Sequence, residues 1–268
     1  MMESTKKLTR GLKDISPIFT LPEPPPVKKP AEVQILSVSC PNGEGDSLLL
    51  NTYFASRLAS SQKPCSLISI LSRASNVCPL HSRAAKVEPF GQHIKRHTLF
   101  WDELQDVLAE GKIQDVSKDR NAFLDFEYTQ LLYFPEILTM LDKWVLLLKP
   151  DSESLIEGYK MLKAGLTLNP LMECFVLLES KANPPADSSI FEKFAAVASK
   201  HLNINLGWLG WLDLSDPESF FNAQLNVDQL HFQPSHTRPS LEKMVLASWL
   251  ESSEGVIERA IGERGMSL

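Results

Sequence analysis

Two patterns of apolar residues alternate along this chain from residue 31 onward. Short apolar runs rich in leucine and β-branched residues have the length of buried strands, and segments with helical spacing of apolar residues lie between them. The predicted strands cover residues 33–40, 65–71, 121–126, 144–149, 173–179 and 206–212. The predicted helices cover residues 47–60, 101–110, 129–142, 151–165, 187–201 and 239–262. Because such alternation builds parallel sheets covered by helices, we predict an α/β fold with a doubly wound, mostly parallel sheet flanked by helices.

The first thirty residues differ from the rest of the chain in composition and spacing. Five apolar side chains recur there at near-helical spacing and form the stripe of a short amphipathic segment: Leu8, Leu12, Ile15, Ile18 and Phe19. Residues 21–30 are rich in proline and predict a stiff, extended spacer. We therefore predict an interaction peptide over residues 1–20, a linker over 21–30 and one domain over 31–268. The alternative for residues 1–20 is a frayed terminus that contacts nothing.

Composition and charge exclude several classes of protein. The 268 residues are 43% hydrophobic, which is enough for one large buried core, and the formal net charge is −6. A negative chain has no overall attraction to nucleic acid or to an anionic membrane, so we expect no nucleic-acid binding and no direct membrane insertion. No apolar run approaches the roughly 18 residues of a membrane span, and no signal peptide is recognisable. We expect a cytoplasmic protein, recruited to the membrane or pole, if at all, by a partner.

A glycine-containing turn lies between the first predicted strand and the first predicted helix. Its residues Gly43, Gly45, Asp46 and Ser47 follow the order of a phosphate-binding loop, in which glycine amides face the phosphates, a lysine neutralises them and Ser or Thr holds magnesium. Here Asp46 stands where the lysine belongs. One charge pair at about 4 Å is worth about 4 kcal/mol, so replacing attraction by repulsion strongly weakens phosphate binding. By itself the motif is equally well explained as an ordinary strand-to-helix turn.

Four collinear segments carry a resemblance to a known family. Residues 144–163 contain an apolar strand, then Pro150, an acid and a serine, and then a helix with Tyr159 and a Leu-Lys pair. One further segment lies upstream, at residues 100–111, and two lie downstream, at residues 206–216 and 233–241, all in the matching order. The pattern resembles the MinD/ParA ATPases, especially the FlhG-like branch that governs flagellar number and placement. The resemblance covers about residues 31–250 and implies a P-loop NTPase-like fold of the MinD/ParA type.

Compared with that family, the positions that bind and hydrolyse ATP are altered. The resemblance places Pro41 at a lysine that reaches the nucleotide of a dimer partner, and Glu179 at an asparagine that reads adenine. Residues 66–72 offer hydroxyls where the family has acids that orient water and magnesium. Asp125 matches the aspartate of the central strand, but residues 126–129 contain no glycine for a γ-phosphate switch. Because phosphoryl transfer depends on positioning and charge neutralisation, the resemblance implies a degenerate member without catalytic residues.

These observations predict a non-catalytic pseudo-ATPase that acts as a protein-binding scaffold or regulator. The resemblance to FlhG-like proteins implies a role in the placement or assembly of a bacterial cell-envelope machine, such as a flagellum, pilus, secretion or polysaccharide system. A protein partner would bind the N-terminal peptide and a face of the domain, and homodimers and heterodimers both stay open. No cofactor is expected. The alternative is a weak ATP- or ADP-binding switch, aided by magnesium, with little or no hydrolysis.

A cysteine and three histidines raise the question of a metal site. Cys78 and His81 form a C-x-x-H pair, and His93 and His97 form an H-x-x-x-H pair, with spacings compatible with tetrahedral zinc. No second cysteine supports the first pair, so we predict a polar connection without a metal ion. Reduced thiols are expected for the four cysteines of a cytoplasmic chain: Cys40, Cys65, Cys78 and Cys174.

Overall fold

The structure is a computed structural model that describes most of the predicted domain. The described residues are 32–41, 47–60, 63–71, 93–111, 120–126, 130–131, 134–180, 189–215, 223, 225–232 and 239–251. The glycine-turn residues Gly43, Gly45 and Asp46 and the Cys78–His81 pair lie outside them. The residues predicted to bind a partner also lie outside and stay predictions: Leu8, Leu12, Ile15, Ile18 and Phe19.

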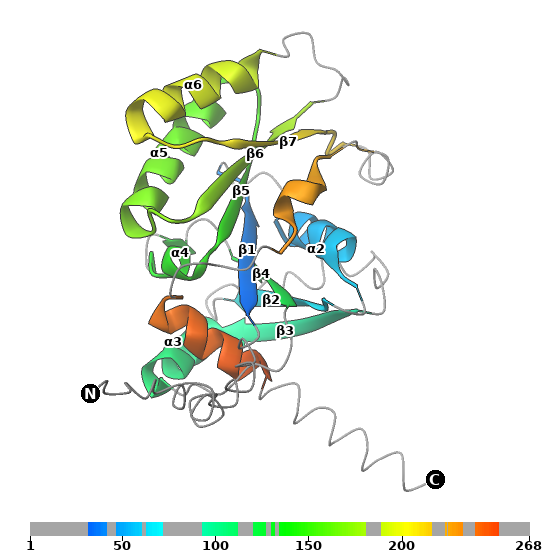
Figure 1. Ribbon diagram of the computed structural model, residues 1–268, viewed down its shortest axis with the longest axis vertical. Helices are drawn as coiled ribbons and strands as arrows, with labels where there is room; N and C mark the ends of the chain where they lie inside the picture. The colour runs from blue at the N-terminus through cyan, green and yellow to red at the C-terminus, as the bar shows by residue number, and fades with distance from the viewer. Residues whose placement is uncertain are drawn as a thin grey trace, which may run out of the picture. The chain divides into compact units, whose positions relative to one another are not determined.

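Seven parallel strands form one sheet in the described part of the chain (Figure 1). Their order is β3-β2-β4-β1-β5-β6-β7. The strands are β1 Val33–Ser39, β2 Cys65–Leu71, β3 Ile94–Phe100, β4 Arg120–Asp125, β5 Lys143–Leu148, β6 Glu173–Glu179 and β7 Gly207–Leu212. Because the chain builds first to one side of β1 and then to the other, the sheet is doubly wound. The predicted α/β fold with a doubly wound, mostly parallel sheet is confirmed.

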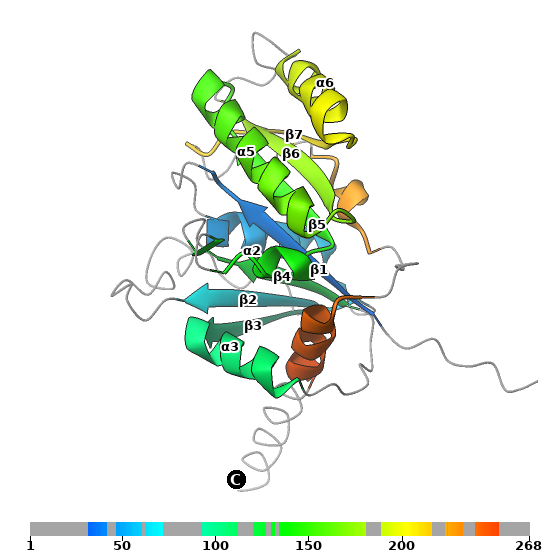
Figure 2. The same cartoon turned by 90° about the vertical axis from the view of Figure 1, so that its left-hand side faces the viewer.

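Helices cover both faces of this sheet (Figure 2). One face packs against α3, α4, α5, α6 and a helix of residues 241–251, and the other packs against α2 and the 3₁₀ helix η4. The helices are α2 Ser47–Leu58, α3 Trp101–Glu110, α4 Ile137–Met140, α5 Ser152–Leu168, α6 Ile190–Leu202 and η4 Val227–Leu230. None of the described helices is both long and apolar enough to cross a membrane.

The central strands are apolar on both sides because both sides are covered. In β5, Trp144 and Leu146 belong to the core under α5, whereas Val145 and Leu147 belong to the core under α2. Strands of this kind read as continuous apolar runs, so the sequence predicts β5 to within one residue at each end. The indole of Trp144 is fully buried and satisfies its N–H by donating to Ser39 Oγ at 3.0 Å.

Two predicted elements are wrong. Residues 94–100, expected to be a polar connection, form the edge strand β3, which pairs in parallel with β2 along its whole length. An edge strand carries polar and charged residues, so β3 lacks the apolar signature of the central strands. Residues 129–142 were expected to be one helix, but within their described part only Ile137–Met140 is α-helical. Pro135 explains the difference, because proline disfavours helix at the residue before it.

Two side-chain contacts join the helix of residues 241–251 to the amino-terminal ends of β4 and β5. Arg120 Nη2 donates to Glu251 Oε2 at 2.8 Å, and Lys243 Nζ donates to Asp142 Oδ1 at 2.6 Å. Arg120 is the first residue of β4, and Asp142 directly precedes β5. Both contacts are partly buried, so they fix where this helix lies on the sheet.

Candidate functional site

The candidate site is built where α2 begins, beside the carboxyl end of β4. Ser47, the first residue of α2, donates its hydroxyl hydrogen to Asp125 Oδ1 at 2.8 Å. Asp125 is the last residue of β4 and is 6% exposed. Two residues predicted for a vestigial nucleotide loop, 78 positions apart, are therefore brought together. The other three, Gly43, Gly45 and Asp46, lie outside the described residues.

Asn51 supports this pair from one turn further along α2. Its Nδ2 donates to the carbonyls of Ser47 at 2.9 Å and Val38 at 3.1 Å, and to Asp125 Oδ1 at 3.3 Å. Its Oδ1 accepts from the backbone N–H of Val38 at 2.9 Å. The pairing of β1 with β4 ends at Leu36, so the Asn51 amide replaces a strand neighbour at Val38. One buried side chain thus joins β1, α2 and β4.

Sequence reasoning missed Asn51, and one signal was available. Asn51 stands directly after the leucine run 48–50, on a helix whose neighbouring side chains are almost all buried. A polar amide in such surroundings needs several internal hydrogen-bond partners. The sequence therefore indicates that Asn51 is bonded inside the protein, although it does not indicate to which residues.

The described cysteines are poor nucleophiles. Cys40, Cys65 and Cys174 are buried and form no disulfide within the described part of the chain, as expected for reduced core thiols. Burial raises the pKa of Cys65 and of Cys174 to about 12. The thiolate is the reactive form of cysteine, so neither of these two residues is suited to covalent catalysis at neutral pH.

Further positions of the family comparison lie at the carboxyl edge of the sheet. Glu179, placed by the resemblance at an adenine-reading asparagine, is half-buried at the end of β6. Pro41 is buried just beyond β1. This edge is where open α/β sheets bind ligands. Two strands, β1 and β5, separate β6 from β4, so Glu179 lies roughly 14 Å along the edge from Asp125.

The two histidines considered for zinc, His93 and His97, differ in burial. His97 lies within β3, is 8% exposed, and has its ring centroid 5.7 Å from that of Trp249. His93 precedes the strand and is exposed. Among the described residues, no three His, Cys, Asp or Glu side chains are grouped so as to hold a metal ion. The partners proposed for the first pair, Cys78 and His81, lie outside these residues.

The chemistry available at Ser47 and Asp125 is that of oxygen ligands. A hydroxyl and a carboxylate are the side chains that hold magnesium beside a phosphate-binding loop. They would supply two of the about six oxygens that this ion needs. In the sequence, the residue before Ser47 is the acid Asp46.

No protein-family model matches this sequence, and none of the curated proteins matches it. Among solved structures, a plasmid partition protein from Borrelia burgdorferi is 11% identical, with a TM-score of 0.49, covering 75% of this chain and 98% of that one. A ParA family ATPase from Chlorobium tepidum TLS is 13% identical, with a TM-score of 0.46 and coverage of 82% and 97%. The MinD cell division protein of Aquifex aeolicus is 10% identical, with a TM-score of 0.42 and coverage of 80% and 95%.

Proposed function

We propose that this protein is a non-catalytic, FlhG-like pseudo-ATPase of the MinD/ParA type. In this proposal it serves as a protein-binding scaffold in the placement or assembly of a bacterial cell-envelope machine. The observation that carries the non-catalytic part is the hydrogen bond from Ser47 to Asp125. It supports aligning Ser47 with the magnesium-binding hydroxyl of a phosphate-binding loop, and therefore Asp46 with the lysine that precedes that hydroxyl.

By that alignment, the carboxylate of Asp46 takes the place of the lysine, in addition to the carboxylate of Asp125. Asp125 is nearly buried next to Ser47, and Asp46 adjoins Ser47 in the sequence. At about 5 Å and an effective dielectric near 20, one carboxylate repels one phosphate charge by about 3 kcal/mol. Backbone amides at a helix start return only about 1–2 kcal/mol. The balance opposes nucleotide binding, so we infer that the loop stays free of ATP.

One observation favours the alternative of weak ATP or ADP binding with magnesium. The hydroxyl of Ser47 and the carboxylate of Asp125 stand at hydrogen-bond distance, as two ligands of one cation would. A divalent cation between them and a phosphate would offset part of the repulsion. Residues 126–129 still offer no glycine to approach a γ-phosphate, so this alternative comprises binding without turnover.

A groove between α5 and α6 supplies the domain face for a protein partner. It has a volume of about 390 Å³, and its apolar and aromatic lining consists of Leu155, Ile156, Tyr159, Ile190, Phe194 and Val197. Ile156 and Val197 are 55% and 46% exposed, which is typical of a surface that another molecule covers. Lys193 adds a positive charge to the lining. We infer that the occupant is an amphipathic helix of the partner that places apolar anchors in the groove.

Capture experiments with matched variants test the scaffold function. The tagged full-length chain is used to capture a partner from cells, and the identified partner is then titrated against purified variants. Ile156→Glu should weaken binding at least about tenfold, because it places a charge in the groove. Leu171→Glu is the matched control, since Leu171 is 68% exposed and lies outside the groove lining. Equal affinity of the two variants would contradict the groove as the partner face.

Deletion of residues 1–24 tests the predicted interaction peptide separately. The shortened chain should fold with an unchanged circular dichroism spectrum, because it retains the whole predicted domain. It should lose partner capture at low protein concentration. Capture that is unaffected by the deletion refutes the peptide hypothesis but leaves the groove hypothesis standing.

Phosphate release tests the non-catalytic part of the proposal. Both the wild-type protein and the variant Asp46→Lys should release no more phosphate from ATP than a buffer blank. The lysine alone should not restore hydrolysis, because the water-positioning acid and the switch glycine of the family are also replaced. Release by Asp46→Lys clearly above the blank contradicts this account.

A further inference from the structure

A row of polar side chains crosses three neighbouring strands on the sheet face that α2 covers. The parallel register pairs Thr98 of β3 with Ser69 of β2, and Ser69 with Asp125 of β4. Neighbouring strands are about 4.8 Å apart, so these side chains stand side by side. Arg96 precedes Thr98 by two positions in β3 and therefore lies on the same face.

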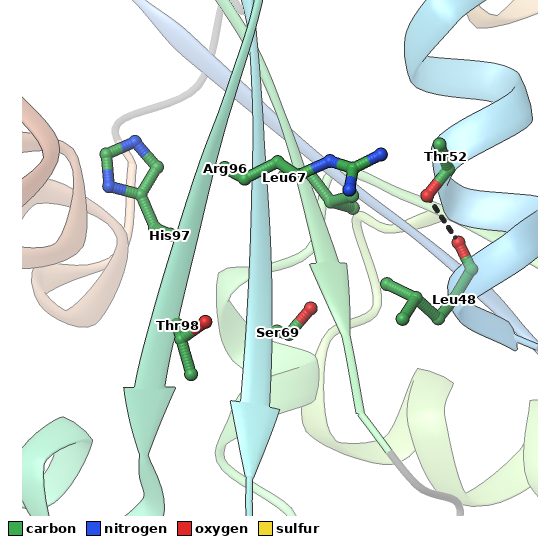
Figure 3. A pocket seen from close by; sticks show the side chains of 7 residues that line it. All are labelled: Leu48, Thr52, Leu67, Ser69, Arg96, His97 and Thr98. Carbon is green, nitrogen blue, oxygen red and sulfur yellow. Dashed lines mark hydrogen bonds between the residues drawn. The ribbon is translucent and has the colours of Figure 1, made fainter. Parts of the chain in front are cut away.

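Part of this row borders a small cavity between the sheet edge and α2 (Figure 3). The cavity has a volume of about 10 Å³, enough for one water-sized group. Side chains from α2, β2 and β3 line it on this face: Leu48, Thr52, Leu67, Ser69, Arg96 and Thr98. Figure 3 shows Arg96 reaching from β3 toward α2, whereas His97 points to the opposite face, toward Trp249.

The polar groups around the cavity lack partners within the described part of the chain. Ser69 is 4% exposed, yet its hydroxyl makes no hydrogen bond to another described residue. Arg96 and Thr98 are exposed and make neither a hydrogen bond nor an ion pair within the same part of the chain. A hydroxyl that borders the cavity, beside a guanidinium without a hydrogen bond or ion pair in the described part of the chain, therefore indicates a place for a polar ligand.

We propose that this cavity binds a phosphate-type oxyanion, with Arg96 as its charged donor. Three polar side chains of the lining, Arg96, Ser69 and Thr98, can all donate hydrogen bonds, and no carboxylate is among the lining residues. The planar fork of a guanidinium matches two oxygens of a phosphate. One further oxygen enters the cavity and accepts hydrogen bonds from the hydroxyls of Ser69 and Thr98. The ligand is thus a small phosphate-bearing molecule, for which inorganic phosphate is the probe.

The one carboxylate of the polar row does not cancel this attraction. Asp125 lies one strand beyond Ser69, and its Oδ1 already accepts hydrogen bonds from Ser47 and Asn51. Coulomb energy falls with distance, so the contacting guanidinium of Arg96 outweighs the more distant carboxylate. The site uses the middle of β2 and β3 rather than the glycine turn, so it stands whether or not the loop binds nucleotide. A bound anion would tie the sheet edge at β3 to α2.

Titration of inorganic phosphate against the full-length chain, followed by ³¹P line width at constant ionic strength, tests the site. The wild type should give saturable broadening. Arg96→Met should weaken binding at least about tenfold, because it removes the charge-assisted hydrogen bonds. Lys95→Met is the matched control, since it removes one cation from the same strand on the opposite face. It should bind phosphate as the wild type does.

Two results overturn the proposal. One is the absence of saturable broadening with the wild type at about 10 mM phosphate. The other is equal loss of binding in Arg96→Met and Lys95→Met, which would mean general charge attraction rather than a site. If Arg96→Met does not fold by circular dichroism, Ser69→Ala replaces it, because loss of one hydroxyl leaves the packing intact. Ser69→Ala should weaken binding about threefold, and unchanged binding would contradict the cavity as the site.

Discussion

Replacement of Asn51 by alanine should loosen the candidate site and destabilise the whole fold. The Asn51 side chain is fully buried and bonds to both backbone groups of Val38, to the carbonyl of Ser47 and to Asp125. Each buried polar group that loses its partner costs about 1–3 kcal/mol. The two groups of Val38 alone therefore cost about 2–6 kcal/mol, a large part of the about 5–15 kcal/mol by which a domain is stable.

Urea unfolding followed by tryptophan fluorescence measures this cost. Asn51→Ala should lower the free energy of unfolding by about 4 kcal/mol. Ser56→Ala is the matched control on the same helix, because the Ser56 hydroxyl makes one bond, to Tyr53 O at 2.6 Å. The control should lose less than about 1 kcal/mol. If Asn51→Ala loses no more stability than Ser56→Ala, the Asn51 side chain does not hold β1, α2 and β4 together.

A charged replacement at Asn51 gives a second test of the same contacts. Asn51→Asp keeps an acceptor for Val38 N–H but sets a second carboxylate beside Asp125, where the present contact is 3.3 Å. Two neighbouring carboxylates raise the pKa of one of them, so the native variant binds an extra proton and loses stability as pH rises. The deficit relative to wild type should be larger at pH 7 than at pH 5. A deficit that does not change with pH contradicts this geometry.

Two further substitutions test the packing behind the site. Lys143, 1% exposed, donates to Gln229 O at 2.7 Å and His231 O at 3.2 Å, so Lys143→Met should cost about 1–3 kcal/mol in urea unfolding. Burial lowers the pKa of Lys143 in the folded state from its ordinary value of 10.5. Just below that pH the unfolded chain therefore binds more protons than the folded chain, so the stability of the wild type relative to Lys143→Met should increase as pH rises. A difference in the free energy of unfolding that does not change with pH would contradict this. A Cβ on Gly165 would lie 2.7 Å from Trp144 Cζ3, so Gly165→Ala should lower the melting temperature despite its helix propensity. An unchanged or higher melting temperature would refute that overpacking.

The sequence predicts the central sheet well because the central strands are buried on both faces. β5 and β6 carry apolar residues at nearly every position, so their limits are recognisable without knowledge of their neighbours. β3 gives no such signal, because Lys95, Arg96 and Thr98 are exposed at the sheet edge. Its strand conformation depends on pairing with β2, which is a tertiary interaction rather than a local preference.

The candidate site could be predicted only in part, because its contacts join distant residues. Ser47 was found through the loop motif and Asp125 through the family resemblance, and the structure supplies their contact. Asn51 bonds to residues 13 and 74 positions away, which no local pattern encodes. The cavity at Arg96 requires the register of β3 on β2, and the sequence does not predict β3 at all. Register between strands is set by the whole sheet, so sites that depend on it emerge only from the fold.

Equilibrium dialysis of the full-length protein against labelled ATP and magnesium tests the central claim most directly. We predict no saturable binding up to about 1 mM ATP, because the proposed alignment sets Asp46 in place of the cation that would neutralise the phosphates beside Ser47 and Asp125. Binding of one ATP per chain with a dissociation constant below about 0.1 mM, weakened by Ser47→Ala, would contradict it.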